Sequence, residues 1–273
     1  MTDRNFSDVA LLITHFNRSG SLRRLLSKFQ ELECSFAEII VSDDCSKPEH
    51  LQKLEQMKSE FNFVLVTTPV NKGLGNNINK GQDRVTKPYT LYVQEDFVPK
   101  AEFPMRFADA LELMDKHADM DIARFYGYVP YPYTLPFERG FEIMNFKLWY
   151  PGYLKFYSYS DHPHLKRSNF LEKFGRYKEG VNVDIAEYNM CLAFLKNGGR
   201  GFIYPRISDL FDQLNNADEP STAAYRKDWK LSPNIFVRLL RKAYLQYKAL
   251  KYHKDFLAYP KPESEQVKNY NNG

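Results

Sequence analysis

Short apolar runs alternate with segments of helical periodicity through the first hundred residues, and this alternation restricts the fold more than any other feature. The apolar runs predict strands at 9–14, 38–42, 63–67 and 89–93. The segments between them predict helices at 22–29, 48–60 and 73–85. Strands joined by helices at this pitch form βαβ units. The sequence therefore predicts an α/β fold with a mostly parallel, doubly wound sheet flanked by helices.

The second half of the chain predicts fewer strands. Helical periodicity indicates helices at 100–120, 169–174 and 183–196, and Asn197-Gly198-Gly199 is a typical helix stop. Residues 121–165 are rich in tyrosine and proline, which favours irregular strands and loops over the sheet.

Composition excludes several classes of protein. Hydrophobic residues at 43% and charged residues at 26% are unlike a disordered or collagen-like chain. Three cysteines without Cys-x-x-Cys spacing argue against a disulfide framework and a structural zinc site. No apolar stretch approaches the roughly 18 residues that span a bilayer, and Met1–Asp8 carries charges in place of an apolar signal core. We expect a cytoplasmic protein.

The net charge of +4 is unevenly distributed along the chain. From Arg226 onward there are 11 Lys and Arg against 4 Asp and Glu. Within this region, residues 232–256 predict an amphipathic helix with an apolar face beside basic side chains. Such a helix either binds an anionic membrane surface or packs on the body of the protein with its lysines in solvent. Both interpretations stay open.

Polar clusters follow each of the first four predicted strands, where open parallel sheets bind their ligands. They are Thr14-His15-Phe16-Asn17, Asp43-Asp44, Asn71-Lys72-Gly73 and Gln94-Glu95-Asp96. One such cluster alone is explained equally well as a helix cap or a solvated loop. Four on one edge predict a binding site, because adjacent carboxylates repel unless a cation or a hydrogen-bond donor compensates them.

These clusters make the chain similar, over about residues 8–215, to the inverting family-2 glycosyltransferases, which have the GT-A fold and use nucleotide-diphosphate sugars. LLITHFNR at 11–18 resembles their first strand and turn, with Thr14 in place of a proline and Phe16 in place of a tyrosine. IIVSDDCS at 39–46 resembles their second-strand signature. Their Asn-x-Gly run is matched by Asn71, Gly73, Asn79 and Gly81.

The resemblance implies a GT-A, Rossmann-like catalytic domain over 1–225, with a donor half at about 1–100 and an acceptor half at about 101–225. The basic helical tail then occupies 226–273. The expected partners are a nucleotide-sugar donor and a glycan or lipid-linked acceptor, with no nucleic acid. Binding of the tail helix to lipid would place the protein at the inner face of the membrane.

The resemblance assigns the strand-end clusters to the donor. The ring of Phe16 can stack on a nucleobase, and Asp43 or Asp44 can accept a hydrogen bond from a base N–H, which suits the imide of uracil. The glycine turn after Asn71 lets backbone approach the ligand. The expected donor-binding residues are Thr14, Phe16, Asn17, Asp43, Asp44, Asn71, Gly73, Gln94 and Glu95.

Gln94-Glu95-Asp96 stands where the family carries its Asp-x-Asp metal motif. The resemblance implies that Asp96 is the principal ligand of Mg²⁺ or Mn²⁺ on the donor diphosphate. However, Gln94 replaces the first aspartate, and Gln213 lies near where many relatives carry a metal-binding histidine. Because an amide oxygen binds a hard cation less strongly than a carboxylate, a Lys or Arg is an alternative partner for the diphosphate.

Inversion by direct displacement needs a base that takes the proton of the acceptor hydroxyl. When residues are counted back from Arg200 along the segment that resembles the family, Glu187 takes the place of the family's catalytic aspartate. Asp184 is the second candidate. At positions i and i+3 the two carboxylates lie on one side of a helix. The alternative is structural, with Asp184 as an N-cap and Glu187 completing a capping box.

Two aromatic residues are expected on the acceptor side. Trp149 is expected to stack on a sugar ring, and His162 to contact the acceptor. His162 and His164 flank a proline and lack cysteine partners, which favours loop or acceptor contacts over metal binding.

The implied activity is inverting transfer of a hexosyl group from a nucleotide-diphosphate donor, a UDP-sugar by preference, in surface-polysaccharide assembly. Two other functions stay open. A catalytically degenerate fold that binds glycans or serves as a scaffold is favoured by Gln94 and Gln213. A sugar-phosphate nucleotidyltransferase is disfavoured, because such enzymes carry a Gly-rich loop after the first strand and residues 14–20 contain only Gly20.

Overall fold

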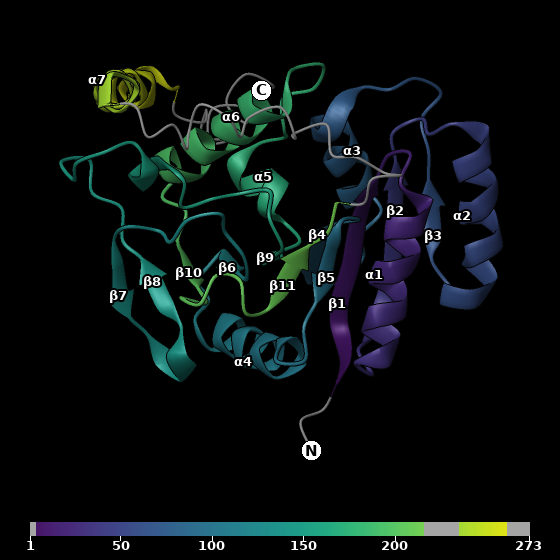
Figure 1. The fold of residues 1–273 in the computed structure, drawn as a ribbon. Coiled ribbons are helices and arrows are strands. Elements are labelled where there is room, and N and C mark those ends of the chain that lie inside the picture. Colours follow the sequence, from purple (N-terminus) through teal and green to yellow (C-terminus); the bar gives the residue numbers. More distant parts are fainter. Residues whose placement is uncertain (1–3, 216–234, 261–273) are drawn as a thin grey trace, which may run out of the picture.

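A computed structural model describes residues 4–215 and 235–260 (Figure 1). Nine strands form one sheet in the order β3-β2-β1-β4-β9-β6-β10-β8-β7, and β11 pairs with β5 in a second sheet. The strands are β1 (Asn5–His15), β2 (Ser35–Asp43), β3 (Val64–Val66), β4 (Tyr89–Gln94), β5 (Phe97–Pro99), β6 (Ile122–Arg124), β7 (Thr134–Pro136), β8 (Glu142–Met144), β9 (His164–Arg167), β10 (Gly201–Ile203) and β11 (Phe211–Gln213).

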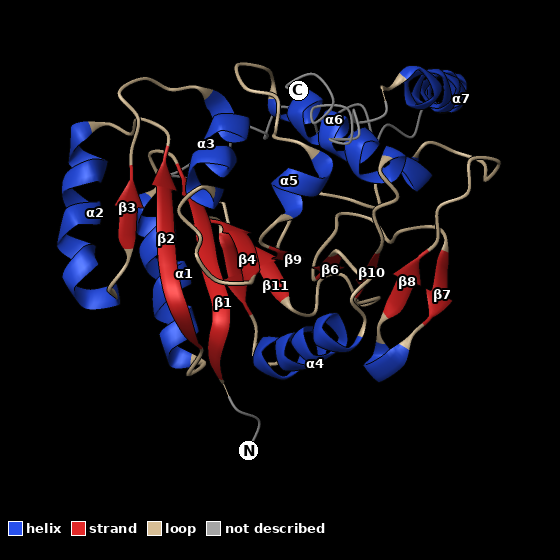
Figure 2. Ribbon diagram, turned by 180° about the vertical axis from the view of Figure 1, so that it is seen from behind, coloured by secondary structure: helices blue, strands red, loops and turns tan. Residues whose placement is uncertain are grey.

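Helices cover both faces of the large sheet (Figure 2). They are α1 (Ser19–Glu31), α2 (Pro48–Phe61), α3 (Gly73–Gln82), α4 (Phe103–Lys116), α5 (Phe170–Phe174), α6 (Val183–Lys196) and α7 (Ile235–Ala258), with short 3₁₀ turns η1 (Glu138–Gly140) and η2 (Leu154–Phe156). The predicted α/β fold with a mostly parallel sheet flanked by helices is confirmed, and β3, β2, β1 and β4 pair in parallel.

The sheet separates two hydrophobic cores. One contains the apolar sides of α1, α2 and α4, and the other those of α3, α5 and α6. Because successive strand residues face opposite sides, β1 contributes to both: Leu11 and Ile13 lie in the first core, Leu12 in the second, and all three are completely buried. Because β1 is buried on both faces, its sequence is a continuous apolar run.

The mixed character of the sheet was not predicted. Strand β9 runs antiparallel between β4 and β6. Its sequence, HLKR, contains two residues that are normally exposed, yet His164 and Lys166 are fully buried. Polar residues on a central strand remove the apolar signal on which strand prediction depends.

Helix α3 lies unusually close to the sheet. A Cβ at Gly81 would lie 2.5 Å from Cδ1 of Leu12 and 3.0 Å from Cβ of Ser42, so only glycine fits there without displacement of a neighbour. Ser42 Oγ also donates to the carbonyl of Asn77 over 2.7 Å. These contacts hold the middle and the C-terminal part of α3 against β1 and β2.

Helix α6 has the predicted bounds, but its cap differs from the structural alternative considered above. Asn182, not Asp184, is the N-cap, and its side chain accepts the Asp184 N–H over 2.9 Å. The helix ends at Asn197, followed by Gly198 at a φ of +70°, as the stop signal predicted.

Helix α7 packs beside α6 at the top of both views (Figures 1 and 2). Tyr252 stacks on Tyr188 with ring centroids 4.0 Å apart, and Lys196 Nζ donates to the carbonyl of Phe256 over 3.0 Å. Within the described ranges, no helix is long and apolar enough to cross a bilayer. The part of the predicted helix over 232–234 lies outside the described residues.

Candidate donor-binding and catalytic site

A buried hydrogen bond joins the carboxyl ends of β1 and β2. His15 Nδ1 lies 2.7 Å from Oδ1 of Asp43, and both side chains are fully buried. Because His15 Nε2 accepts the backbone N–H of Arg18 over 3.2 Å, the ring proton sits on Nδ1 and is donated to Asp43. Ser46 also donates to Asp43, through its hydroxyl and through its N–H at 2.9 Å.

These contacts determine the charge state of Asp43. Burial opposes its ionisation, but the hydrogen bonds from His15 and Ser46 outweigh burial and lower the pKa of the carboxyl. The Asp43 carboxylate thus serves first to hold the two strand ends together. Lys80 Nζ donates to the backbone carbonyl oxygen of Asp43 over 2.6 Å, and burial lowers the pKa of Lys80 to about 8.

Asp44 joins the end of β2 to the loop that precedes α3. Its Oδ1 accepts the N–H of Lys72 over 2.9 Å, and its Oδ2 accepts the N–H of Gly73 over 2.8 Å. The φ of Gly73, +82°, belongs to the left-handed region that glycine adopts without strain. A carboxylate offers about four acceptor positions, so Asp44 keeps acceptor capacity beyond these two bonds.

The other predicted donor residues lie around these two carboxylates. Asn17 N–H donates to Ser46 Oγ and its side-chain oxygen accepts from Lys47 N–H, each over 2.7 Å. Thr14 is buried, and its hydroxyl lies 3.0 Å from that of Tyr92. Phe16 and Asn71 are exposed.

Arg18, which directly follows the first cluster, pairs with both acidic residues after β4. Its Nη1 lies 3.1 Å from Oδ2 of Asp96 and 3.6 Å from Oε1 of Glu95. All three side chains are nearly buried. Gln213 Nε2 donates to the same Asp96 oxygen over 3.0 Å, and Asn215 accepts from Arg18 Nη2 over 2.7 Å. The ends of β1, β4 and β11 therefore meet at one charged cluster.

The donor set at Asp96 does not fit the expected divalent cation. A guanidinium already neutralises Asp96 and Glu95, and a second cation there would be repelled. Gln213 turns an N–H donor toward Asp96, whereas a metal ligand must offer a lone pair. Among the described residues, no three or more His, Cys, Asp or Glu side chains are grouped to hold a metal ion.

A hydrogen-bonded path leads from the end of β4 to α6. Gln94 Nε2 donates to the carbonyl oxygen of Asp161 over 3.2 Å, and the N–H of Asp161 donates to Oε1 of Glu187 over 3.2 Å. The path connects the position of the missing metal-motif aspartate to the predicted base. Donor-half and acceptor-half residues are thus connected through the backbone of a single residue, Asp161.

The environment of Glu187 suits a base. Burial is the largest influence on its carboxyl and raises its pKa, while hydrogen bonds from Asp161 and Ser160 and the charge of Arg124 moderate the rise. A raised pKa makes a carboxylate a stronger proton acceptor. Asp184, the second candidate, lies one turn earlier on α6 and is exposed.

Beneath this path lies a buried polar cluster. Lys166 Nζ, Asp161 Oδ2 and His164 Nε2 are buried without a hydrogen-bond partner among the described residues. Burial lowers the pKa of Lys166 to about 7. Burial, and then the charge of Glu187, raise the pKa of the Asp161 carboxyl. The pair Asp161 and Lys166 therefore has reduced charge beneath Glu187.

Of the two predicted acceptor-side residues, the structure connects one, His162, to the charged cluster of Arg18 and Asp96. His162 packs edge-on against Tyr128 with ring centroids 4.5 Å apart, and the Tyr128 hydroxyl donates to Gln213 Oε1 over 2.7 Å. Burial, then the charge of Arg124, lower the pKa of His162 to about 3, so its ring is neutral. Trp149 is 77% exposed, and within the described residues its ring contacts are with Lys147 and Tyr150.

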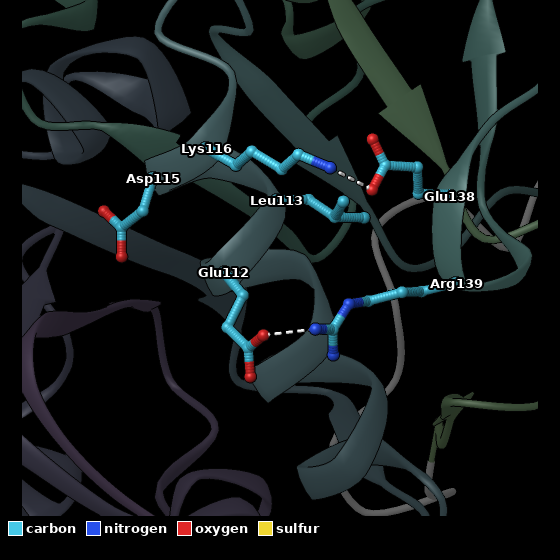
Figure 3. Close-up of a pocket in the computed structure, with 6 residues that line it drawn as sticks. All are labelled: Glu112, Leu113, Asp115, Lys116, Glu138 and Arg139. Atoms are coloured by element: carbon cyan, nitrogen blue, oxygen red, sulfur yellow. Dashed lines mark hydrogen bonds and ion pairs between the residues drawn. The ribbon is translucent and has the colours of Figure 1, made fainter.

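A surface hollow lies elsewhere, between α4 and η1 (Figure 3). Its lining consists mainly of exposed ion pairs, such as Lys116 with Glu138 at 2.6 Å and Arg139 with Glu112. No predicted site residue lines it. We treat these pairs as surface contacts that tie η1 to α4.

Four residues of the site were not predicted individually. His15 and Arg18 stood inside the first motif, and Ser46 inside the second, so their positions after strands were a usable signal. Asp161 lies in SDHPHLKR, where no periodicity indicates its contact with α6. That contact joins segments 26 residues apart and depends on the tertiary fold.

Comparison with known proteins agrees with this architecture. The solved structure of S. aureus TarS 1–349 in complex with UDP-GlcNAc is similar at a TM-score of 0.60, with 16% identity over 92% of this chain and 71% of that chain. The mannosyltransferase PcManGT from Pyrobaculum calidifontis, in complex with GDP-Man and Mn²⁺, is similar at 0.56, with 13% identity over 94% and 76% of the two chains. At such identities the likeness shows the fold, which is the GT-A fold.

Sequence comparison identifies the family. No curated protein sequence matches significantly. The model of glycosyl transferase family 2 matches residues 10–175, which is more than half of the chain and includes the clusters after β1, β2 and β4. The chain belongs to glycosyl transferase family 2.

Proposed function

We propose that this chain transfers a sugar, with inversion, from a nucleotide-diphosphate donor to a hydroxyl group of a glycan or a lipid-linked saccharide, and that Glu187 is the base. The observation that supports this most is the contact path from Gln94 through Asp161 to Glu187. It places a carboxyl of raised pKa beside the strand ends where GT-A proteins carry their nucleotide chemistry.

The nucleoside is proposed to bind beside Asp44 and Phe16. Asp44 is held by two backbone N–H groups of the loop before α3, so its orientation is fixed before ligand arrives. Its remaining acceptor capacity suits the imide N–H of uracil. The exposed ring of Phe16 offers a stacking surface, worth on the order of 1–3 kcal/mol for a base. We favour a UDP-sugar on these grounds, and the UDP-GlcNAc complex of TarS is consistent with that choice.

The diphosphate is proposed to meet Arg18, which begins α1. The guanidinium is a permanent cation whose planar donors match phosphate oxygens, and the N-terminus of α1 adds the positive end of a helix dipole. On donor binding, Arg18 exchanges part of its pairing with Glu95 and Asp96 for the phosphates. The proposal assigns to an arginine the charge neutralisation that a divalent metal ion can supply at a diphosphate.

The chemical step follows from these positions. The acceptor oxygen attacks the anomeric carbon, the bond from that carbon to the diphosphate oxygen breaks, and the acceptor proton passes to Glu187. The leaving group departs as the nucleoside diphosphate, stabilised by Arg18. His162 and Tyr128, neutral and adjacent to the path, are proposed to line the acceptor side.

We place the reaction in the cytoplasm, and this location remains a prediction.

A ligand screen tests this proposal. Thermal unfolding is measured with UDP-GlcNAc, other UDP-sugars and GDP-mannose, each with EDTA and with Mn²⁺, because a ligand at 100 times its Kd stabilises by about 2.7 kcal/mol. We expect a UDP-sugar to stabilise the protein in EDTA, and saccharide acceptors to release free UDP from it.

Two outcomes would support the other functions. Donor binding without release of nucleoside diphosphate for any acceptor indicates a binding protein. Release of pyrophosphate from a nucleoside triphosphate and a sugar phosphate indicates a nucleotidyltransferase.

A further inference from the structure

Among the described residues, helix α7 contacts the body through a single stripe of side chains. Tyr252 is buried against Tyr188, Phe156 and Tyr157, and its hydroxyl lies 3.0 Å from that of Tyr157. Phe256 packs on Phe146 with ring centroids 5.4 Å apart. These residues lie at i and i+4, so they occupy a single stripe of the helix.

The opposite side of α7 is apolar and exposed. Its large apolar residues are between 57% and 72% exposed, namely Leu239, Leu240, Tyr247, Leu250 and Leu257. Residues 240, 243, 247, 250, 254 and 257 follow each other at intervals of three and four, which places them on one face. No described residue covers this face. The described part of the fold therefore covers only some of the apolar face predicted for this helix.

The charge of α7 selects among the possible occupants of this face. The helix carries six basic side chains and one acid, Asp255. Lys254 lies within the exposed apolar face, and Lys242 and Lys251 lie at its margins. Pairing two copies of this helix would bring like charges together in an apolar seam, which is costly. A surface of anionic lipid supplies both an apolar layer and the opposite charge.

We propose that the outer face of α7 binds an anionic membrane surface, with its leucines and Tyr247 at the level of the acyl boundary and its lysines among the headgroups. Long lysine side chains bury their methylenes while the ammonium remains in the polar layer. The helix lies in the plane of the bilayer and does not span it.

The position of α7 gives this docking a consequence for catalysis. Tyr188, which stacks on Tyr252 and donates to Asp255 over 3.1 Å, is the residue next to Glu187 in α6. Helix α7 also lies on the side of the molecule toward which β1 and β2 run (Figures 1 and 2). A bilayer bound at α7 therefore faces the same side of the molecule as the strand ends that carry the candidate site, which is the side from which a lipid-anchored acceptor would approach.

Vesicle binding tests the inference with the full-length chain. Sedimentation with phosphatidylglycerol–phosphatidylcholine vesicles is compared with phosphatidylcholine vesicles, without substrates, so the result does not depend on the proposed transfer activity. We expect binding to the anionic vesicles only, weakened by salt as the Debye length falls from about 10 Å at 0.1 M to about 3 Å at 1 M.

Two variants on the outer face have matched controls elsewhere. Lys254→Glu and Leu250→Gln are each expected to weaken vesicle binding on the order of tenfold. Lys53→Glu, at an exposed position of α2, and Leu135→Gln, at an exposed position of β7, are expected to leave it unchanged. Thermal unfolding of each variant confirms that it is folded.

Equal binding to neutral and anionic vesicles, or equal loss in the variants and their controls, overturns the proposal. The proposal is also overturned if the protein binds no vesicles and forms a concentration-dependent dimer that Leu250→Gln dissociates. That result identifies a second copy of the chain as the occupant.

Discussion

The backbone N–H of Asp161 donates a 3.2 Å hydrogen bond to Oε1 of Glu187. The carbonyl oxygen of Asp161 accepts from Gln94 over the same distance, so the backbone of this one residue connects the end of β4 to α6. Because a hydrogen bond to a carboxylate stabilises its charged form, the contact opposes the rise of pKa that burial imposes on Glu187. The contact both orients the proposed base and limits its pKa.

Removal of the Gln94 donor tests this connection. Gln94→Met keeps the length of the side chain and removes its N–H, so the loop at Asp161 loses one anchor, worth about 1 kcal/mol. We expect kcat to fall roughly fivefold and the Kd of the donor, measured by calorimetry, to stay unchanged. Gln56→Met on the exposed side of α2 is the matched control. Loss of donor affinity without loss of kcat would assign Gln94 to the donor instead.

The pH dependence of catalysis should report the half-buried carboxyl of Glu187. Glu187 acts only when ionised, and burial raises its pKa above the ordinary value of 4.5. The rate constant kcat/KM is therefore expected to fall as the pH decreases through a value above 4.5, roughly tenfold per pH unit below it. Since Asp161 and Glu187 interact, this limb belongs to the pair. A profile that stays flat down to pH 4.5 contradicts the assignment.

Arg18 is expected to act on the diphosphate and not on the nucleoside. Arg18→Met should weaken UDP binding by roughly 10- to 100-fold, the range for loss of hydrogen bonds to charged groups, and leave uridine binding unchanged. Arg23→Met on α1, which removes an exposed ion pair with Glu60 of α2, is the control. EDTA should leave turnover of the wild type unaffected. Activity that disappears in EDTA and returns with Mn²⁺ would refute the arginine assignment.

Gly81 is expected to matter through packing. Gly81→Ala brings a Cβ within 2.5 Å of Leu12 Cδ1, and overpacking of this kind costs about 1–3 kcal/mol. The cost of overpacking exceeds or cancels the gain in stability of about 1 kcal/mol from alanine's higher helix propensity. Urea unfolding should therefore show no stabilisation and a net loss on the order of 1 kcal/mol. Gly20→Ala, exposed in α1, should gain stability, and a similar gain at position 81 would mean that α3 is not tightly packed on β1.

The sequence predicted those features whose signals are local. The apolar run around Leu11, the spacing of Leu22, Leu25 and Leu26, and the stop at Asn197 each report on one element, and all appear in the structure. The family motifs placed Asp43, Asp44 and Asp96 after their strands, and the structure brings those strand ends together.

Features that depend on tertiary contacts were missed. Strand β9 enters the sheet with His164 and Lys166 buried, against the ordinary preference of both residues, so its pattern did not indicate a strand. The pairing of Arg18 with Asp96, and of Asp161 with Glu187, joins residues distant in sequence. Neither spacing nor composition predicts such contacts. The pairing of Arg18 with Asp96 places a guanidinium where the sequence predicted a metal ion.

Substitution of Glu187 tests the central claim most directly. Glu187→Gln retains the shape and the hydrogen-bond acceptor but removes the base, and Asp184→Asn, one turn earlier and exposed, is the matched control. With a UDP-sugar and a saccharide acceptor, Glu187→Gln is expected to lower kcat by roughly 10²–10⁴-fold, with donor Kd unchanged and Asp184→Asn close to wild type. Wild-type turnover in Glu187→Gln, or a comparable loss only in Asp184→Asn, would contradict the account.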